Sequence, residues 1–84
     1  MITVRLPSML RQPEMPHELH LDVPLSTIDE VVWEVDHRFP GFATAVDDTL
    51  FNFAVNDSLI LHGARQQTLH HGDVVEVIPI IAGG

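Results

Sequence analysis

One helix-forming segment limits the fold of this sequence more than any other feature. Residues 27–39 begin with Thr27-Ile28-Asp29-Glu30, a capping-box pattern with Thr27 as N-cap, and Pro40-Gly41 follows them. The apolar residues within the segment share one helix face: Ile28, Val31, Val32, Val35 and Phe39. Trp33 lies off this face and is expected to shield the rim of the core. A chain of 84 residues with one amphipathic helix must bury that helix face against a sheet.

Five other segments alternate apolar and polar residues, which is the pattern of half-buried strands. They are residues 2–6, 19–23, 51–55, 58–62 and 74–78. The first two segments are expected to form a hairpin with a long connection, and Asn56-Asp57 has the composition of a turn. The order of elements predicts an α+β domain, in which about five strands form a sheet and the main helix packs on one of its faces.

The charge balance excludes some functions and favours others. The chain has 12 acidic and 4 basic residues, a net charge of -8 and a pI near 4.9. Binding of nucleic acid needs clustered basic residues, so it is not expected, whereas a basic protein partner suits this charge. The absence of cysteine agrees with a reducing cytosol, and no signal peptide or membrane span is recognised, so a cytoplasmic protein is expected.

All four basic residues are arginines, so the chain contains no lysine. If the C-terminus becomes an activated acyl group, no ε-amine of the same chain can intercept it. Compositional drift in a small acidic protein explains the absence equally well.

The end of the chain differs from the rest. We divide the sequence into a domain over residues 1–78 and a flexible tail over residues 79–84, because Pro79 cannot donate to a sheet ladder. Six extended residues reach at most roughly 20 Å. Gly83 and Gly84 carry no side chain and can enter a narrow channel, which makes the Gly84 carboxylate the candidate functional group. Against this stands the general rule that small residues at chain ends carry no function.

The sheet face opposite the helix, called here the uncovered face, is the candidate docking surface. If Val75 and Val77 point toward the helix, Val74, Glu76 and Ile78 lie on the uncovered face. Residues 58–62 can present either Leu59 and Leu61 or Ile60 and His62 on it. With the tail, this predicts an apolar partner-binding patch composed of Leu59, Leu61, Val74, Ile78, Ile80, Ile81 and Ala82.

Three motifs carry a resemblance to a known family. They are Arg38-Phe39-Pro40-Gly41 after the helix, Ala54-Val55-Asn56-Asp57-Ser58-Leu59-Ile60 around the turn, and Leu69-His70-His71-Gly72-Asp73-Val74-Val75-Glu76-Val77-Ile78-Pro79 leading to Ala82-Gly83-Gly84. Over nearly its whole length the chain resembles the β-grasp, ubiquitin-like sulfur carriers, such as the small subunit of molybdopterin synthase and the thiamine sulfur carrier. The resemblance implies a mixed sheet whose first and last strands lie parallel in the centre.

The resemblance also implies a reaction cycle at Gly84. A ubiquitin-activating-type enzyme adenylates the carboxylate with ATP and Mg²⁺, and a sulfur donor converts the adenylate to a thiocarboxylate. The chain would be a carrier with no tightly bound cofactor. Leu59 and Ile78 match positions that face the large subunit in complexes of the molybdopterin synthase type. The enzyme that accepts the sulfur would be of the molybdopterin synthase type or of the cysteine synthase type. The second alternative rests on a resemblance to carriers of cysteine biosynthesis in Leu6-Pro7-Ser8-Met9-Leu10-Arg11.

Two other functions fit the same sequence. One is a protein modifier conjugated to other proteins through Gly84, and the other is an interaction domain with an incidental tail. A metal site is not expected, because the six histidines form no recognised ligand pattern: His17, His20, His37, His62, His70 and His71.

Overall fold

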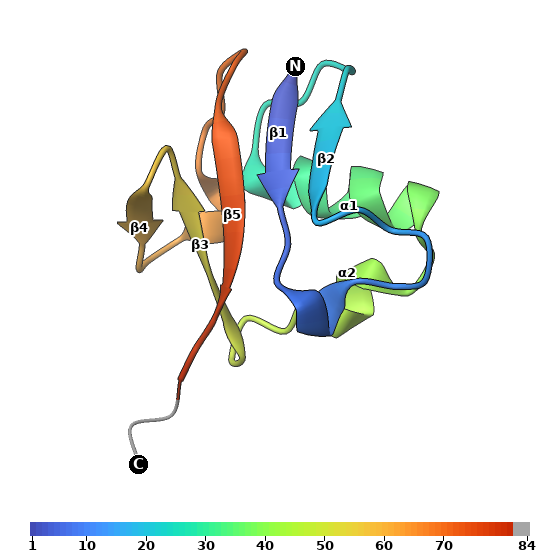
Figure 1. Cartoon of the computed structure of the whole chain (residues 1–84). Helices are drawn as coiled ribbons and strands as arrows, with labels where there is room; N and C mark the ends of the chain where they lie inside the picture. Colours follow the sequence, from blue (N-terminus) through green and yellow to red (C-terminus); the bar gives the residue numbers. More distant parts are fainter. Residues whose placement is uncertain (82–84) are drawn as a thin grey trace.

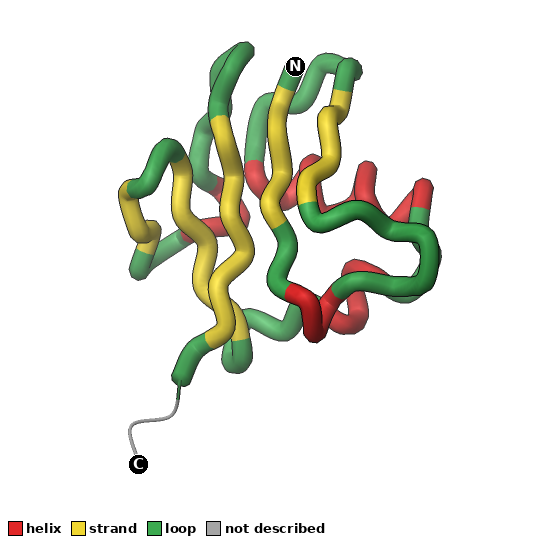
Figure 2. The backbone as a smooth tube through the Cα atoms, viewed as in Figure 1, coloured by secondary structure: helices red, strands yellow, loops and turns green. Residues whose placement is uncertain are grey.

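A five-stranded sheet packs one face against the main helix in the computed structural model, which describes residues 1–81 (Figures 1 and 2). The sheet and the helix form the two layers of an α+β domain, as the sequence predicts. In chain order the elements are β1 (Ile2–Arg5), η1 (Ser8–Leu10), β2 (Glu18–Leu21), α1 (Ile28–Arg38), α2 (Phe42–Ala45), β3 (Phe51–Val55), β4 (Ser58–Ile60), η2 (Ala64–Gln66) and β5 (Val74–Pro79).

The strand order is β2-β1-β5-β3-β4, so the first and last strands lie next to each other in the centre of the sheet. They run parallel, whereas the other neighbouring strands are antiparallel. This confirms the mixed sheet that the family resemblance implies. The parallel pair also places the start of β1 and the end of β5 at opposite ends of the sheet, as Figure 1 shows.

The N-terminus of α1 is capped as predicted, with one difference. The Thr27 hydroxyl accepts a hydrogen bond from the Glu30 backbone N–H at 3.2 Å. The Glu30 carboxylate accepts from the N–H of Ser26, one residue earlier than the capping box places it. Asp29 and Glu30 in the first turn, and His37 and Arg38 in the last, oppose the partial charges of the helix ends.

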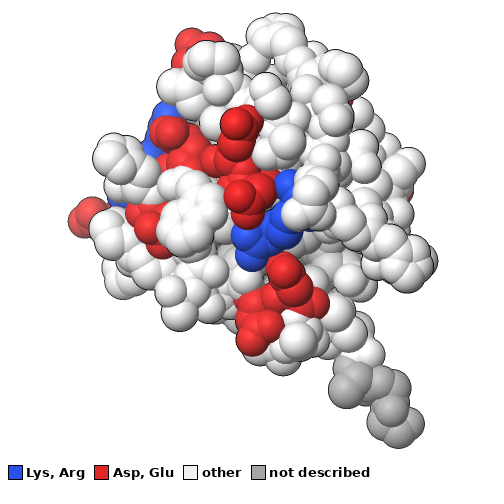
Figure 3. All heavy atoms as spheres, turned by 180° about the vertical axis from the view of Figure 1, so that it is seen from behind, with Lys and Arg blue, Asp and Glu red and all other residues white. Residues whose placement is uncertain are grey.

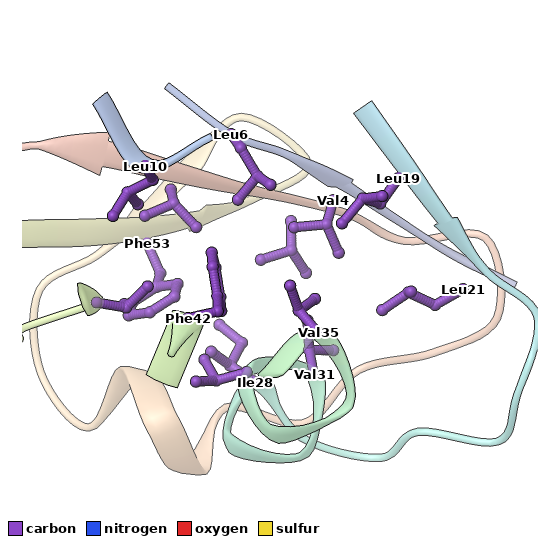
Figure 4. Packing of buried hydrophobic residues seen from close by; sticks show 14 of the residues in the cluster. Val4, Leu6, Leu10, Leu19, Leu21, Ile28, Val31, Val35, Phe42 and Phe53 are labelled. Atoms are coloured by element: carbon purple, nitrogen blue, oxygen red, sulfur yellow. The ribbon is translucent and has the colours of Figure 1, made fainter. Parts of the chain in front are cut away.

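The core lies between α1 and the inner face of the sheet (Figure 4). Four residues of the apolar face of α1 are buried there: Ile28, Val31, Val32 and Val35. Phe39, at the C-cap, is only partly buried. Phe42 of α2 fills the space beside Phe53 of β3. Removal of each large aliphatic or aromatic side chain from water contributes about 1.5–3 kcal/mol, which offsets the entropy of ordering a chain this short. Trp33 does not join this layer, because 58% of its surface is exposed, so the prediction that it shields the core rim is wrong.

Five strand ends differ from the predicted segments. β1 ends at Arg5, one residue before its predicted end, and β2 begins at Glu18, one residue before its predicted start. β2 ends at Leu21 because Leu21 pairs with Ile2, the first residue of β1, and Val23 has no neighbour on that strand. β4 ends at Ile60, after which Gly63 turns the chain in the left-handed region with φ 63°. β5 extends through Pro79, one residue beyond its predicted end.

The short helix α2 was not predicted from the sequence. Its N-cap, Gly41, has φ 100°, which only glycine adopts without strain. The Asp36 carboxylate accepts hydrogen bonds from the N–H groups of Gly41 and Ala43, so the end of α1 holds the start of α2. Four residues are too few to show a helical periodicity in sequence.

Candidate functional site: the end of β5 and the uncovered face

β5 carries the chain out of the centre of the sheet. It pairs with β3 until Pro79, and the Ile80 N–H still donates to the Leu50 carbonyl at 2.8 Å. Ile80 is 43% exposed and Ile81 is 88% exposed. Ile81 is thus the last described residue and is almost fully exposed, and the division into a domain over residues 1–78 and a tail over residues 79–84 stays a prediction. Ala82, Gly83 and Gly84 lie outside the described residues.

The register of the strands decides which side chains share the uncovered face. Ala54 of β3 pairs with Leu59 on one side and with Glu76 on the other, so all three lie on the same face. Val74 and Ile78 lie on either side of Glu76 along β5, while Val75 and Val77 are buried against the helix layer. Of the two arrangements open for residues 58–62, the structure adopts the one that places Leu59 outward. Leu59 is 49% exposed, and Leu61, just beyond the strand, is 67% exposed.

A row of charged residues crosses the β1 and β2 half of the same face. Arg5 pairs with Glu18 of β2 and with Glu76 of β5 across the sheet. The Arg5 guanidinium binds the Glu18 carboxylate at 3.2 Å, and His20 lies 3.7 Å from the other Glu18 oxygen. The uncovered face thus has an apolar half around β3, β4 and the end of β5, and a charged half around β1 and β2.

The helix layer presents a different surface. Figure 3 shows acidic groups gathered around arginine side chains on this side of the molecule. Arg65 of η2 binds Asp29 at 3.0 Å and Asp48 at 3.1 Å, donates to the Val46 carbonyl and lies 5.7 Å from the centre of the Phe53 ring. An open hollow of about 240 Å³ adjoins Arg65. Because two carboxylates already neutralise the guanidinium, this hollow is not an anion site.

The start of β5 is held by a polar clamp. Asn56, in the β3–β4 turn, donates through its side chain to the Asp73 carboxylate at 2.9 Å and accepts from the Val74 N–H at 2.9 Å. The His70 N–H and the Asn56 amide both donate to Asp73, and they lower the pKa of its carboxyl from its ordinary value. Asn56 and Asp57 have φ 50° and 70°, the conformation of a tight hairpin turn. The clamp fixes where the central strand begins.

No metal-binding geometry is found in residues 1–81: nowhere do three or more His, Asp or Glu side chains converge on a common point. His71 contacts the Met1 amine, and His20 contacts Thr3 and Glu18. Within the described part of the chain, none of the helices is both long and apolar enough to span a membrane.

The structure brings together part of the predicted site. Leu59, Val74 and Ile78 share the uncovered face, and Leu61, Ile80 and Ile81 are exposed near its edges. Neither the contacts of Arg65 nor the Arg5–Glu18 ion pair were predicted from the sequence. Alternation along 2–6 places Arg5 on the outer face, and alternation along 19–23, continued back by one residue, places Glu18 there too. Their pairing depends on strand register.

Several solved structures have the same fold. A chain of the Amycolatopsis orientalis BexX/CysO complex matches with a TM-score of 0.84 at 23% identity, over 100% of both chains. CysO of Mycobacterium tuberculosis, described as an antigen, matches at 0.82 and 20% identity, over 96% of this chain and 100% of its own. A chain from the complex of subunits 1 and 2 of molybdopterin-converting factor from Helicobacter pylori matches at 0.60 and 20% identity, over 99% and 97%.

The parallel central pair, the single main helix and these matches define a β-grasp, ubiquitin-like domain. No curated protein sequence matches the chain. The model of the ThiS family matches residues 5–84, so the chain belongs to the ThiS family and is a sulfur carrier of the β-grasp type. Small proteins of this type are carriers without catalytic activity of their own.

Proposed function

We propose that the chain carries sulfur as a thiocarboxylate on Gly84 and donates it to a biosynthetic enzyme. The observation that carries the proposal is the family match, which extends through Gly83 and Gly84. The route of β5 supports it, because the central strand delivers Ile80 and Ile81 to the surface, and only Ala82 separates Ile81 from Gly83 in the sequence.

The chemistry requires activation by another protein. A carboxylate is a poor electrophile, so a ubiquitin-activating-type enzyme first joins the Gly84 carboxylate to the AMP part of ATP, with Mg²⁺, and releases pyrophosphate. A sulfur donor then attacks the acyl carbon, and AMP leaves. The product is a sulfur nucleophile that remains attached to a protein and does not diffuse away. The catalytic groups belong to the partners.

We assign the docking of those partners to the apolar half of the uncovered face. Leu59, Ile78 and Ile80 are partly exposed there, beside the point where the chain leaves the sheet. A partner that covers these side chains removes apolar surface from water and holds the tail toward its own active site. The sulfur-accepting partner is of the molybdopterin synthase type, with this chain as its small subunit, or of the cysteine synthase type.

Removal of Gly84 tests the proposal. The truncated chain is expected to keep its fold, since the described core lies within residues 2–77, and to lose sulfur transfer in an assay with the activating enzyme and sulfide. Ile81→Val is the control, because it changes the tail while preserving the end group. Transfer by the truncated chain would contradict the proposal. Gly-Gly remnants on lysines of other proteins would identify a protein modifier instead.

A pair of substitutions tests the docking face separately. Leu59→Ala removes an exposed leucine from the uncovered face, and Trp33→Ala removes a larger exposed side chain from the helix layer. We expect the Leu59 variant to bind the activating enzyme more weakly, by about tenfold for an interface anchor, and the Trp33 variant to bind normally. Equal binding by both would place the docking surface elsewhere.

A further inference from the structure

The ladder between β1 and β5 ends beside two prolines, Pro7 and Pro79, which line the same hollow. The Thr3 N–H donates to the Asp73 carbonyl at 3.0 Å, whereas the Leu6 N–H donates toward β2, to His17. The backbone N–H and C=O groups of odd-numbered residues of β1 are therefore directed at β5. After Thr3 and Arg5, the next odd-numbered residue is Pro7. Since proline has no N–H, it cannot donate to β5.

The same alternation applies to β5. The Ile80 N–H donates to Leu50, and the Val74 carbonyl accepts from Asn56, so even-numbered residues of β5 face β3. Val77 and Pro79 then face β1. Pro79 also lacks an N–H, and the paired residues end at Arg5 and Glu76. The carbonyl oxygens of Val77 and Pro79 are thus directed at a position that β1 leaves without a donor.

A hollow lies at this position, which we call the split. It measures about 150 Å³ and is lined by residues 5–7 and 76–79. Figure 1 shows β5 continuing past the end of β1 while the chain after β1 turns away toward α2. A volume of this size accommodates one side chain of a partner, and it lies next to the place where the chain leaves the sheet.

Glu76 adds a carboxylate to the wall of the split. Among the described residues it has no ion-pair or hydrogen-bond partner, and its neighbours along the strand on the uncovered face are Val74 and Ile78. Its cross-strand neighbour Arg5 is already bound to Glu18, so the three groups together carry one unbalanced negative charge. Covering such a carboxylate with apolar surface costs free energy unless the covering protein supplies a counter-charge.

We infer that the split receives an arginine side chain from the partner that docks on the uncovered face. The guanidinium binds the Glu76 carboxylate and donates to the Val77 and Pro79 carbonyls. Arginine fits better than lysine, because its five donors are held in a planar fork that reaches several acceptors at once. This inference rests on the proposed function in one respect, namely that a partner covers this face.

The inference is tested without the partner. Capped arginine amide is added to the labelled protein, and backbone amide shifts are followed by NMR. Shifts are expected at residues 5, 6 and 76–78, and capped citrulline amide, an uncharged molecule of the same shape, should bind less tightly. Glu76→Gln should weaken binding of the arginine amide about three- to fivefold, the range of a partly exposed ion pair. Glu14→Gln, the same substitution at an exposed site, should leave it unchanged.

A second variant tests the carbonyl groups. Pro7→Ala introduces an N–H that can donate to Val77, so weaker binding of the arginine amide is expected. Shifts spread over the acidic helix layer, or equal binding by the Glu76→Gln and Glu14→Gln variants, would overturn the inference. The binding assay involves no chemistry at Gly84. A negative binding result would therefore not contradict sulfur transfer by the chain. Conversely, a negative transfer assay would not contradict binding of the arginine amide.

Discussion

Arg65 gives the most direct test of how the sheet, α1 and the chain after α2 are held together. Its side chain is 20% exposed and joins Asp29, Asp48, Val46 and Phe53. Arg65→Met keeps most of the aliphatic stem and removes the guanidinium. The change therefore isolates the polar contacts from the packing.

The expected cost follows from these contacts. The two carboxylates are 49% and 65% exposed, so solvent screens both ion pairs, and each contributes at most about 0.5 kcal/mol. The hydrogen bond to the Val46 carbonyl adds about 0.5–1 kcal/mol, and the contact with the Phe53 ring adds about 0.5 kcal/mol. Arg65→Met should therefore lower the free energy of unfolding by about 2 kcal/mol, which corresponds to roughly 10 °C in Tm for a domain of this size.

Urea unfolding followed by circular dichroism measures the effect. Arg38→Met is the control, since Arg38 binds only Glu34 in the described structure, at i and i+4, and should cost about 0.3–0.5 kcal/mol. Arg65→Lys should fall between the two, because it keeps the charge and loses the planar fork. Equal losses for the Arg65→Met and Arg38→Met variants would refute the role assigned to Arg65.

Three further predictions concern single residues. Thr27→Ala removes the α1 cap and should lower the free energy of unfolding by about 1 kcal/mol in urea titrations, whereas a loss within error would show that the cap is dispensable. The Asp73 carboxyl has a lowered pKa in the folded state, so its stabilising contribution is present above about pH 4 and is lost as the pH falls through the folded value. Asp73→Asn should therefore flatten the loss of stability as the pH falls below about 4, and an unchanged slope would contradict this. Gly72→Ala forces alanine into φ 93° and should destabilise by about 1 kcal/mol or more, measured against wild type by thermal unfolding; no change would mean that the turn relaxes freely.

Local patterns in the sequence were sufficient to predict most of the elements. The face formed by Ile28, Val31, Val32 and Val35 is buried as its spacing requires, and all five strands exist. Strand ends were less predictable because they depend on neighbours. β2 stops where β1 has no residue left to pair, and β5 extends to Pro79 because β3 pairs with it on the other side. α2 depends on hydrogen bonds from Gly41 and Ala43 to the Asp36 carboxylate, five and seven residues earlier, and four residues show no helical periodicity that would announce it.

The parts of the candidate site that depend on local alternation were predictable from the sequence, and the parts that depend on distant neighbours were not. Alternation along 74–78 placed Val74 and Ile78 outward, and the register of β3 and β4 then selected Leu59 over Ile60. The split between β1 and β5 was not predictable, since it depends on Pro7 and Pro79 lying at the end of a parallel pair whose register only the fold fixes. Arg65 was missed for a similar reason, because its carboxylate partners lie 17 and 36 residues away in sequence.

Intact mass spectrometry of the protein purified from its native host tests the central claim most directly. The account predicts a fraction of molecules in which sulfur has replaced one oxygen, with the change located at Gly84 by fragmentation. A protein isolated under sulfur-replete conditions with an active partner enzyme, and found only with an unmodified carboxylate, would contradict it.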